Sequence, residues 1–171
     1  FIHGSIGVGK THLLQGVWNR LKKESTNISV VYKPAENWTN EFVYSLRSGG
    51  LESFRKKYRG VDIFLVDDVH FLSNKKGVQE EFLHTFNTLH SMSKRVVFAS
   101  DAHPRLIAQL KESLASRFMS GMIAKIEQAS YDTSLQILRS KASKVRKKIP
   151  ENVLEFISEK FNKNIRSMES A

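Results

Sequence analysis

Residues 4–11 read Gly-Ser-Ile-Gly-Val-Gly-Lys-Thr, which fits the pattern G-x-x-x-x-G-K-[ST]. This pattern constrains the fold because its glycines and lysine work only between a strand and a helix. Both neighbours are indicated. The apolar pair Phe1-Ile2 precedes the motif, and apolar residues recur at helical spacing over residues 13–21. The sequence therefore predicts a strand, a glycine-rich turn and a helix at the start of the chain.

The residue types of this loop suit a polyphosphate ligand. Gly4, Gly7 and Gly9 allow backbone conformations that a side chain would forbid, and they bring amide groups close to a ligand. Those amides and the start of the following helix together attract anions. Lys10 can then reach the β and γ phosphates, and the Thr11 hydroxyl can bind Mg²⁺. A glycine-rich turn with a chance Lys-Thr is the structural alternative, which the flanking elements disfavour.

An apolar run that ends in two carboxylates is expected to form the second half of a nucleotide site. Residues 63–66 are Ile-Phe-Leu-Val, typical of a buried parallel strand, and Asp67 and Asp68 follow directly. Beside a phosphate-binding loop, we expect Asp67 to bind the metal and Asp68 to activate the attacking water. The alternative is a pair of solvated acidic residues in a turn, and the glycine-rich motif elsewhere in the chain disfavours it.

Strand and helix signals alternate along most of the chain, which predicts an α/β fold with a parallel sheet. Hydrophobic residues make up 40% of the 171 residues, enough for a sizeable core. The expected strands cover residues 28–33, 63–66, 95–99 and 122–126. The expected helices cover residues 36–47, 51–58, 77–92 and 106–118.

The strand signals stop after residue 128, and a helical segment follows. We expect helices over residues 132–148 and 151–162, with a third that starts near Asn164. Asp132 is expected to cap the first of them, and Pro150 to open the second. The predicted organisation is therefore an α/β subdomain at 1–128 and a helical lid subdomain at 129–171.

Charge and composition narrow the classes of partner. Lysine and arginine total 27 against 17 acids, for a net charge of +10. This surplus favours nucleic acid as a partner, although a generally basic surface explains it equally well. The chain has no cysteine, no run of about 18 apolar residues that could span a membrane and no visible secretory signal. We therefore expect a cytoplasmic protein, and we expect a further segment before Phe1 because the chain opens on a strand.

Several longer stretches carry a family resemblance, and they follow one another in family order. They are Gly4 to Leu14 with its Thr-His-Leu-Leu extension, Tyr58 to Leu72, Gln79-Glu-Glu-Phe-Leu-His-Thr-Phe-Asn87, Ser100-Asp101, Ser116-Arg-Phe118 and Asn164-Ile-Arg166. With these stretches the chain resembles the AAA+ ATPase module of the DnaA family of bacterial replication initiators. The resemblance implies a P-loop NTPase of AAA+ type, with a parallel sheet flanked by helices and a small helical lid.

The resemblance also implies roles for individual residues. His12 joins the loop residues as a nucleotide-binding position. Asp101 matches the sensor-1 position, which responds to the γ-phosphate. Arg117 matches the arginine finger, which reaches the nucleotide of a neighbouring subunit, and Arg166 matches the sensor-2 arginine of the lid, which acts within its own subunit. An ordinary turn or surface role is the alternative for each of these three charged residues.

A DNA-binding region is implied for the segment between residues 36 and 58, which matches the extra helical pair of initiator-type AAA+ proteins. In the family this insertion lines an axial channel that holds single-stranded DNA. Val43 matches an apolar contact position and Lys75 a basic one, while Arg59 adds local positive charge. Core packing is the alternative for Val43, and a solvated helix face is the alternative for the basic residues.

The sequence departs from the family pattern at a few positions. Ser113 stands where arginine is usual, four residues before Arg117, which puts part of the subunit interface in doubt. His70 stands where glutamine is usual. Neither departure touches the predicted ATP-binding residues.

The resemblance implies a DNA replication initiator that is a slow, switch-type ATPase using ATP and Mg²⁺. ATP-bound subunits would assemble into a helical oligomer that binds and melts origin DNA, and hydrolysis to ADP would reset it. The replicative helicase or its loader is a further candidate partner. A metabolic P-loop kinase is the main alternative of another class, and the presence of Asp101, Arg117 and Arg166 in AAA+ order argues against it. A DnaA-like regulator or helicase loader of the AAA+ class, without its own reader of duplex DNA, stays open. A helix-turn-helix beyond Ala171 would distinguish the initiator from the regulator.

Overall fold

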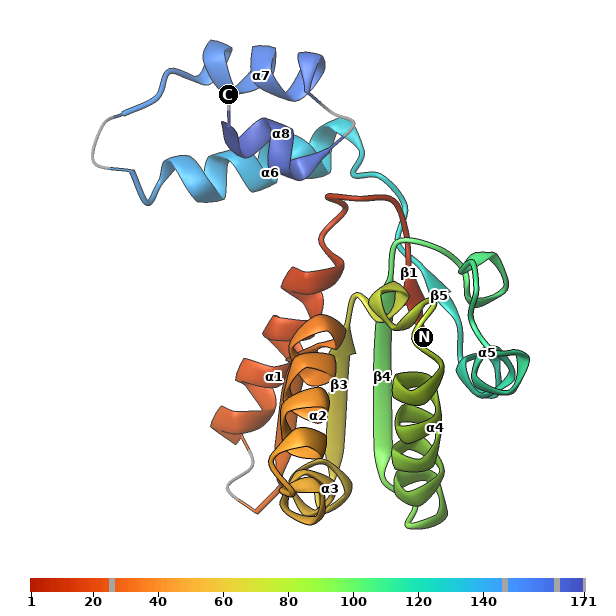
Figure 1. The fold of residues 1–171 in the computed structure, drawn as a ribbon. Helices are drawn as coiled ribbons and strands as arrows, with labels where there is room; N and C mark the ends of the chain where they lie inside the picture. Colours follow the sequence, from red (N-terminus) through yellow and green to blue (C-terminus); the bar gives the residue numbers. More distant parts are fainter. Residues whose placement is uncertain (25–26, 146–147, 162–163, 171) are drawn as a thin grey trace. The chain divides into compact units, whose positions relative to one another are not determined.

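The computed structural model describes residues 1–24, 27–145, 148–161 and 164–170 (Figure 1). The chain divides into two compact units. The first unit consists of residues 1–3 and 10–125, and the second consists of residues 4–9 and 126–171. Within the described residues, no helix has both the length and the apolar character needed to cross a membrane.

The first unit is built on a parallel sheet of five strands in the order β2-β3-β4-β1-β5 (Figure 1). Register pairs Phe64 with Val96, and it pairs His3 with Ser100. The carboxyl ends of β1, β3 and β4 therefore meet at one edge of the sheet, as the sequence predicted. The strands are β1 (Ile2–His3), β2 (Val30–Pro34), β3 (Ile63–Asp67), β4 (Arg95–Ser100) and β5 (Ala124–Lys125).

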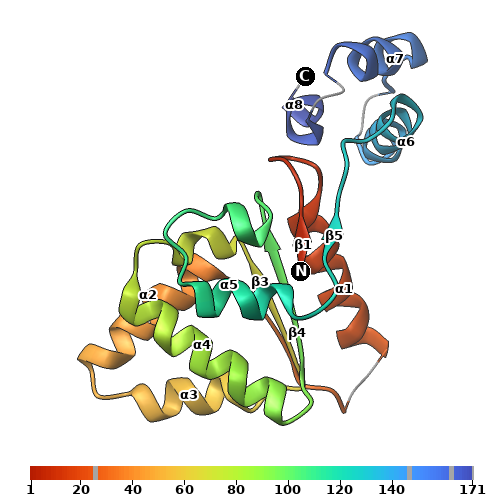
Figure 2. The same cartoon turned by 90° about the vertical axis from the view of Figure 1, so that its right-hand side faces the viewer.

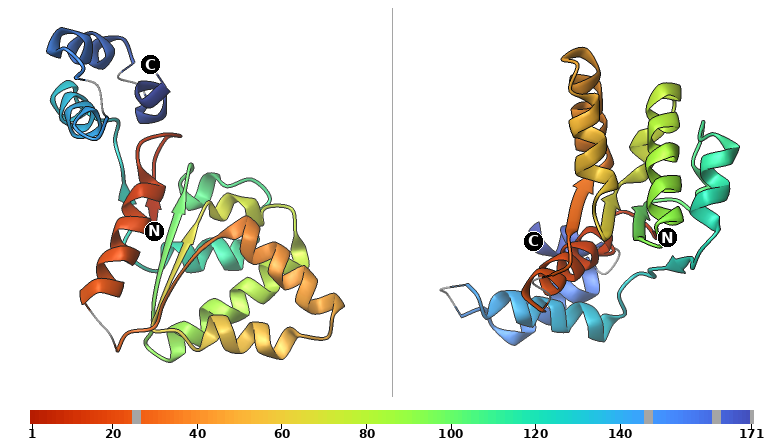
Figure 3. Two further views of the ribbon diagram at one scale, coloured as in Figure 1. Left: turned by 90° about the vertical axis from the view of Figure 1, so that its left-hand side faces the viewer. Right: turned by 90° about the horizontal axis from the view of Figure 1, so that it is seen from below.

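Helices cover both faces of this sheet. Helix α1 (Lys10–Glu24) lies on one face, and the other helices of the unit lie on the opposite face (Figure 3, left). Figure 2 shows this second face, with α4 and α5 in front of the strands. The helices there are α2 (Ala35–Arg47), α3 (Leu51–Arg59), α4 (Lys76–Ser91) and α5 (Glu112–Met119), with the short 3₁₀ helices η1 (Val69–Leu72) and η2 (Pro104–Leu106) near the strand ends.

The core between the sheet and the second face is dominated by aromatic side chains. Trp38 and Phe82 meet edge to face with ring centroids 5.0 Å apart, and Phe98 and Phe118 lie 4.5 Å apart. Each such ring contributes about 1.5–3 kcal/mol on burial, and ring pairs add to this. A smaller cluster under α1 contains Leu14, Val30, Leu65 and Ala99. Packing on both faces holds the strands, and so it fixes where their ends lie.

The second unit contains three helices, α6 (Tyr131–Ala142), α7 (Glu151–Lys160) and α8 (Ile165–Ser170). They share a small core of Leu135, Leu138, Leu154 and Met168. Pro150 occupies the N-cap position of α7, as expected. The cap predicted for α6 was wrong. The Ser130 side chain accepts a hydrogen bond from the Thr133 amide at 3.2 Å, and Asp132 lies in the first turn, where its charge still suits the helix dipole.

Two expected helices differ from the structure. The stretch 106–118 is not one helix, because residues 107–111 leave the helical path and Gln109 takes a left-handed φ of 55°. The Gln109 carbonyl there accepts a 3.0 Å hydrogen bond from the Gln79 side chain, a tertiary contact that local periodicity cannot reveal. Helix α6 ends at Ala142, six residues before the expected end. Residues 146–147, 162–163 and 171, which the expected helices and lid also included, lie outside the described residues.

Candidate nucleotide site

The carboxyl edge of the sheet brings a lysine and a carboxylate together. Lys10 begins α1, and Asp101 follows the last residue of β4. The Lys10 Nζ lies 2.6 Å from the Asp101 Oδ1, and the lysine side chain is 5% exposed. A buried ammonium needs such a partner because an unpaired charge in the interior is costly. The structure thus brings together two residues that are 91 positions apart in the sequence.

Asp67 is held in a defined position at the end of β3. The residue is 2% exposed, its Oδ2 accepts a hydrogen bond from the Tyr32 hydroxyl at 3.1 Å, and its Oδ1 accepts one from the Asp68 amide at 3.0 Å. Burial, with Asp67 close by, raises the pKa of Tyr32 to about 12, so this phenol stays a hydrogen-bond donor at neutral pH. A fixed carboxylate with lone pairs left over fits the hard-oxygen preference of Mg²⁺.

Thr11 and His12 follow Lys10 in the first turn of α1. Thr11 is partly buried and offers a hydroxyl oxygen near the start of the helix, whereas His12 is exposed. A hydroxyl and a carboxylate are the ligand types that a nucleotide-bound Mg²⁺ takes from a protein. The residues present therefore fit the metal that the sequence predicted.

Asp68 marks a sharp change in chain direction directly after β3. Its backbone is left-handed, with φ 53° and ψ 47°, a conformation that is uncommon away from glycine and gathers at functional sites. The Asp68 carbonyl accepts the Phe71 amide at 3.0 Å, which closes the turn of η1. Burial, and then the charge of Asp67, raise the pKa of Asp68 above the ordinary range. A higher proton affinity makes this carboxylate a better general base.

The glycine-rich loop, residues 4–9, belongs to the second unit together with α8. Gly7 has φ 81°, and a Cβ added there would collide with the Asn164 side chain. The Ile165 amide donates a 3.1 Å hydrogen bond to the Gly7 carbonyl. A side chain is also excluded at Gly4, because a Cβ there would collide with the carbonyl oxygen of Ile126. The loop therefore requires glycine at these positions.

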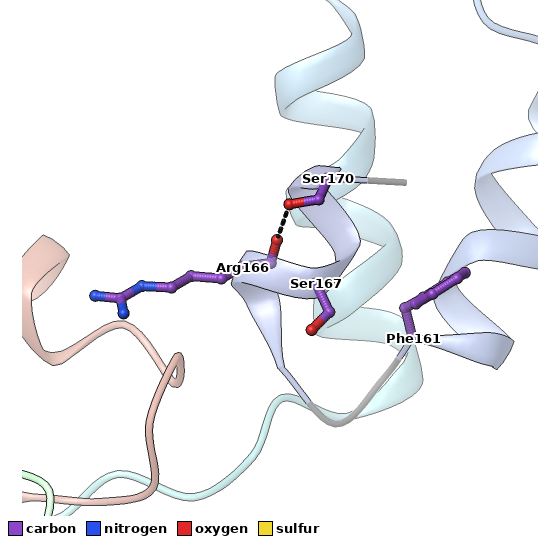
Figure 4. Close-up of a pocket in the computed structure, with 4 residues that line it drawn as sticks. All are labelled: Phe161, Arg166, Ser167 and Ser170. Carbon is purple, nitrogen blue, oxygen red and sulfur yellow. Dashed lines mark hydrogen bonds between the residues drawn. The ribbon is translucent and has the colours of Figure 1, made fainter.

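Arg166 stands in the first turn of α8, next to the residues that contact the loop. The Arg166 amide donates a 2.8 Å hydrogen bond to the Asn164 Oδ1, which caps the helix. Its side chain is exposed. Figure 4 shows Arg166 at a pocket with Phe161, Ser167 and Ser170, its guanidinium extending away from the other three. An Arg166 substitution therefore leaves the contacts between Asn164, Ile165 and Gly7 in place.

Arg117 lies on the solvent side of α5. Leu114 and Phe118 of the same helix are buried in the core, while Arg117 and Ser113 are exposed. The helix thus has a fixed inner face and presents the arginine outward. This placement suits a side chain whose target belongs to another molecule.

The predicted DNA-binding residues differ in how far they are engaged within the fold. Val43 is partly buried and packs against the main core. Arg59 donates to Glu81 at 2.7 Å and to the Thr85 hydroxyl at 3.4 Å. Lys75 is exposed before α4 and donates to the Phe71 carbonyl at 3.0 Å. Of the two basic residues, Lys75 presents its charge more openly to solvent than Arg59.

Two carboxylates that the sequence analysis missed organise this basic region. Glu81 is buried on α4 and pairs with Arg55 as well as Arg59, so it ties α3 to α4. Glu41 accepts hydrogen bonds from three side chains, those of Lys33, Lys57 and Tyr58. Glu81 lies in the stretch 79–87 that carried the family resemblance, and this was the one feature of the sequence that could have pointed to it.

A family model of the bacterial DnaA ATPase domain matches residues 1–125, nearly three quarters of the chain. The chain belongs to this DnaA family. The predicted relationship and the predicted P-loop fold of AAA+ type are therefore confirmed.

Individual DnaA proteins match over the whole chain. It is 43% identical to the chromosomal replication initiator protein DnaA of Caldanaerobacter subterraneus subsp. tengcongensis over 171 residues, which is all of this chain and 39% of that protein. Domain III of the Thermotoga maritima DnaA has a TM-score of 0.95 at 40% identity, over 99% of this chain and 71% of that one. A replication initiator DnaA bound to AMPPCP and single-stranded DNA has a TM-score of 0.88 at 37% identity, over 99% of this chain and 52% of that chain. The chain thus spans about two fifths of its curated relative's length.

Proposed function

We propose that this protein is the ATPase module of a replication initiator, which binds ATP, assembles on DNA in the ATP-bound state and resets by hydrolysis. One observation carries the proposal. In a chain of the DnaA family, Lys10, Asp67, Asp68 and Asp101 converge at one edge of the sheet, as a nucleotide site requires. The relative solved with AMPPCP and single-stranded DNA supports both ligands.

ATP is held by the loop and by the first turn of α1. The amides of residues 4–9 face the phosphates, with Gly4, Gly7 and Gly9 providing the close approach. Lys10 contributes a point charge to the β and γ phosphates, and His12 extends the nucleotide-binding segment. Thr11 and Asp67 would hold Mg²⁺, which neutralises charge on the phosphates when bound.

Hydrolysis needs a base for water and a sensor for the γ-phosphate. A water oxygen attacks the γ-phosphorus, the bond to the bridging oxygen breaks, and ADP leaves while the water proton passes to the Asp68 carboxylate. Asp101 responds to the nucleotide through Lys10, because a phosphate that attracts the lysine competes with the Asp101 carboxylate for it. Because the proposal assigns Arg117 to the nucleotide of a neighbouring subunit, ATP turnover by the isolated subunit would be slow.

Assembly is assigned to Arg117 and the nucleotide response to Arg166, both exposed arginines. Arg117 would contact the γ-phosphate of the neighbouring subunit, where a planar guanidinium stabilises the spread charge. Arg166 would contact the nucleotide of its own subunit, since α8 begins against the glycine-rich loop. ATP would thereby link subunits into a helical oligomer.

DNA binding is assigned to the region around α2, α3 and the start of α4. Lys75 provides an exposed charge, Val43 an apolar contact, and Arg59 both local positive charge and support for α3 through Glu81. The net charge of +10 favours a nucleic-acid ligand in general. We also propose a cytoplasmic location, a replicative helicase or loader as a further partner, and a functional boundary between residues 128 and 129.

Phosphate release and sedimentation together test the proposal. The protein should release phosphate from ATP in the presence of Mg²⁺, and it should sediment as larger species with AMPPCP than with ADP. Absence of phosphate release, combined with one sedimentation coefficient in both nucleotides, would exclude an ATP-controlled switch.

A further inference from the structure

A histidine and two carboxylates cluster beside the hydrolytic site. One ligand atom from each of Asp68, His70 and Asp101 lies within 4.8 Å of the other two, and all three residues are partly buried. His70 has no part in the proposed nucleotide chemistry. Its presence adds a nitrogen donor to a site that otherwise offers only oxygen.

The fold places these side chains together through one turn and one strand pairing. Asp68 turns the chain out of β3 in a left-handed conformation, and η1 then carries His70 in its first turn. His70 therefore follows Asp68 by only two residues, and one ligand atom of each lies within 4.8 Å of the other. Asp101 reaches the same place from β4, the strand hydrogen-bonded to β3. The cluster therefore rests on regular structure that the core holds in place.

The imidazole of His70 has an unused ring nitrogen. Its Nδ1 is buried and has no hydrogen-bond partner among the residues that the structure describes. Leaving a buried polar atom unpaired costs about 1–3 kcal/mol, and such atoms usually have a water or an ion as partner. Imidazole nitrogen is also the commonest metal ligand in proteins.

From these observations we propose that Asp68, His70 and Asp101 bind a first-row transition-metal cation, with Zn²⁺ as the probe, at a site separate from the Mg²⁺ ligands Thr11 and Asp67. Imidazole suits zinc and its neighbours, whereas Mg²⁺ prefers oxygen ligands throughout. Ligands of a tetrahedral zinc lie roughly 3.4 Å apart, as follows from bonds of about 2.0–2.2 Å. Since the ligand atoms lie within 4.8 Å of one another, reaching this spacing needs a contraction of at most about 1.4 Å, within the range of side-chain rotation.

The local charges favour a divalent cation. Asp68 and Asp101 bring two negative charges, and Asp67 adds a third beside them, while Lys10 contributes a positive charge. A carboxylate has two oxygens, so Asp101 can bind a metal through one while Lys10 keeps contact with the other.

Occupation of this site should stop hydrolysis, a consequence that rests on the proposed function. A cation bound to Asp68 would lower the basicity of its carboxylate, which would then accept the water proton poorly. The Mg²⁺ ligands Thr11 and Asp67 and the phosphate contacts of Lys10 are left in place. The cation would thus hold the protein in its ATP-bound state.

Zn²⁺ binding to the nucleotide-free protein tests the site directly, by competition with a chromogenic chelator. The parent protein should bind one Zn²⁺ that His70→Gln weakens at least 10-fold, because glutamine keeps the size and polarity but is a poor zinc ligand. His84→Gln removes an exposed imidazole on α4 and should leave binding unchanged. His103→Gln is the second control, because His103 contacts His3 ring to ring at 5.2 Å and forms the other pair of imidazoles.

Several results would overturn the site. These are no saturable Zn²⁺ binding by the parent, equal binding by the parent and His70→Gln, or a loss as large in His103→Gln as in His70→Gln. Thermal unfolding should show that His70→Gln is folded. If that variant fails to fold, Asp68→Asn replaces it in the binding assay, with the same 10-fold criterion.

Phosphate release at buffered free Zn²⁺ and saturating Mg²⁺-ATP tests the consequence. Zn²⁺ should inhibit the parent, and His70→Gln should need at least 10-fold more free Zn²⁺ for half inhibition. Zinc binding without inhibition would overturn the regulatory role. A parent protein that releases no phosphate even without zinc would contradict the proposed ATPase function, while the binding assay would still decide the site.

Discussion

The Nζ of Lys10 lies 2.6 Å from the Oδ1 of Asp101, and this contact joins the start of α1 to the end of β4. The two residues come from the predicted phosphate-binding motif and from the predicted sensor position. This pairing supports the proposed sensor role of Asp101, because bound ATP phosphates would compete with the Asp101 carboxylate for the same ammonium group. It also shows that the fold holds Lys10, the residue proposed to bind phosphate, in a defined position.

Replacing Lys10 by alanine should weaken ATP binding about 10- to 100-fold. A charge-assisted hydrogen bond contributes roughly 1.5–3 kcal/mol, and the variant loses this at the phosphates. Lys23→Ala, an exposed lysine of the same helix, is the matched control and should bind as the parent does. Calorimetric titration with ATP measures both, and equal affinities for Lys10→Ala and the parent would rule out the nucleotide-site assignment.

Asp68→Asn should leave ATP affinity within about twofold and slow phosphate release by about 10²–10⁴-fold, the usual contribution of a general base. The amide keeps the size of the carboxylate and removes its ability to take a proton. Single-turnover phosphate release separates this step from product release. Turnover at the parent rate would mean that another group activates the water.

Arg117→Ala and Arg166→Ala should differ in kind. Arg117→Ala should bind ATP normally as a monomer but fail to form ATP-dependent oligomers, because its target lies in the next subunit. Arg166→Ala should change the nucleotide response even in dilute monomer. Light scattering with ATP and ADP measures assembly, and normal assembly by Arg117→Ala would refute the finger assignment.

A mixture of variants sharpens this test. Arg117→Ala can supply bound ATP, and Lys10→Ala can supply an intact Arg117, so together they complete one composite interface. The mixture should form ATP-dependent dimers, while each variant alone should stay monomeric. Monomers in the mixture would argue against a role of Arg117 across the interface. Ser113, which stands where arginine is usual, would then indicate that the subunits contact each other differently.

Glu41 should stabilise the fold in a pH-dependent way. Burial alone would raise the pKa of Glu41, but hydrogen bonds from Lys33, Tyr58 and Lys57 outweigh it and lower this pKa from 4.5 to about 2. The folded-state pKa is depressed, so the stabilisation is present above about pH 4.5 and is lost as the pH falls toward 2. Because the side chain is 35% exposed, solvent screening reduces the expected gain to the order of 1 kcal/mol.

Urea unfolding of Glu41→Gln at pH 7 and at pH 3 measures this effect. The deficit in the free energy of unfolding, relative to the parent, should be larger at pH 7 than at pH 3. Glu52→Gln, an exposed acid of α3, should show little difference at either pH. A Glu41→Gln deficit that is constant with pH would assign the effect to packing instead of charge.

The sequence predicted the parts of the fold that depend on local patterns. The apolar run at 63–66 became β3, and the motif at 4–11 does connect β1 to α1, because strand composition and glycine placement are local signals. The prediction of one helix over 106–118 was wrong, because the Gln109 carbonyl accepts a hydrogen bond from the side chain of Gln79, thirty residues away. Local patterns carry no record of such a contact.

The candidate site shows the same division. The approach of Asp101 to Lys10 followed from family order and parallel topology, whereas the left-handed turn at Asp68 and the return of His70 through η1 did not. Sequence spacing also left Arg59 as a surface charge, although it is paired with the buried Glu81. Tertiary pairing of charges is set by neighbouring helices, so residue types alone could not predict it.

The binding of single-stranded DNA in ATP compared with ADP tests the central claim most directly. Fluorescence anisotropy with a labelled strand should show at least 10-fold tighter binding with ATP than with ADP, and the affinity should fall with added salt through counterion release. Val43→Ala combined with Lys75→Ala should reduce this binding while ATP affinity stays at the parent value. Equal affinity for the strand in ATP and ADP would contradict an ATP-controlled DNA switch.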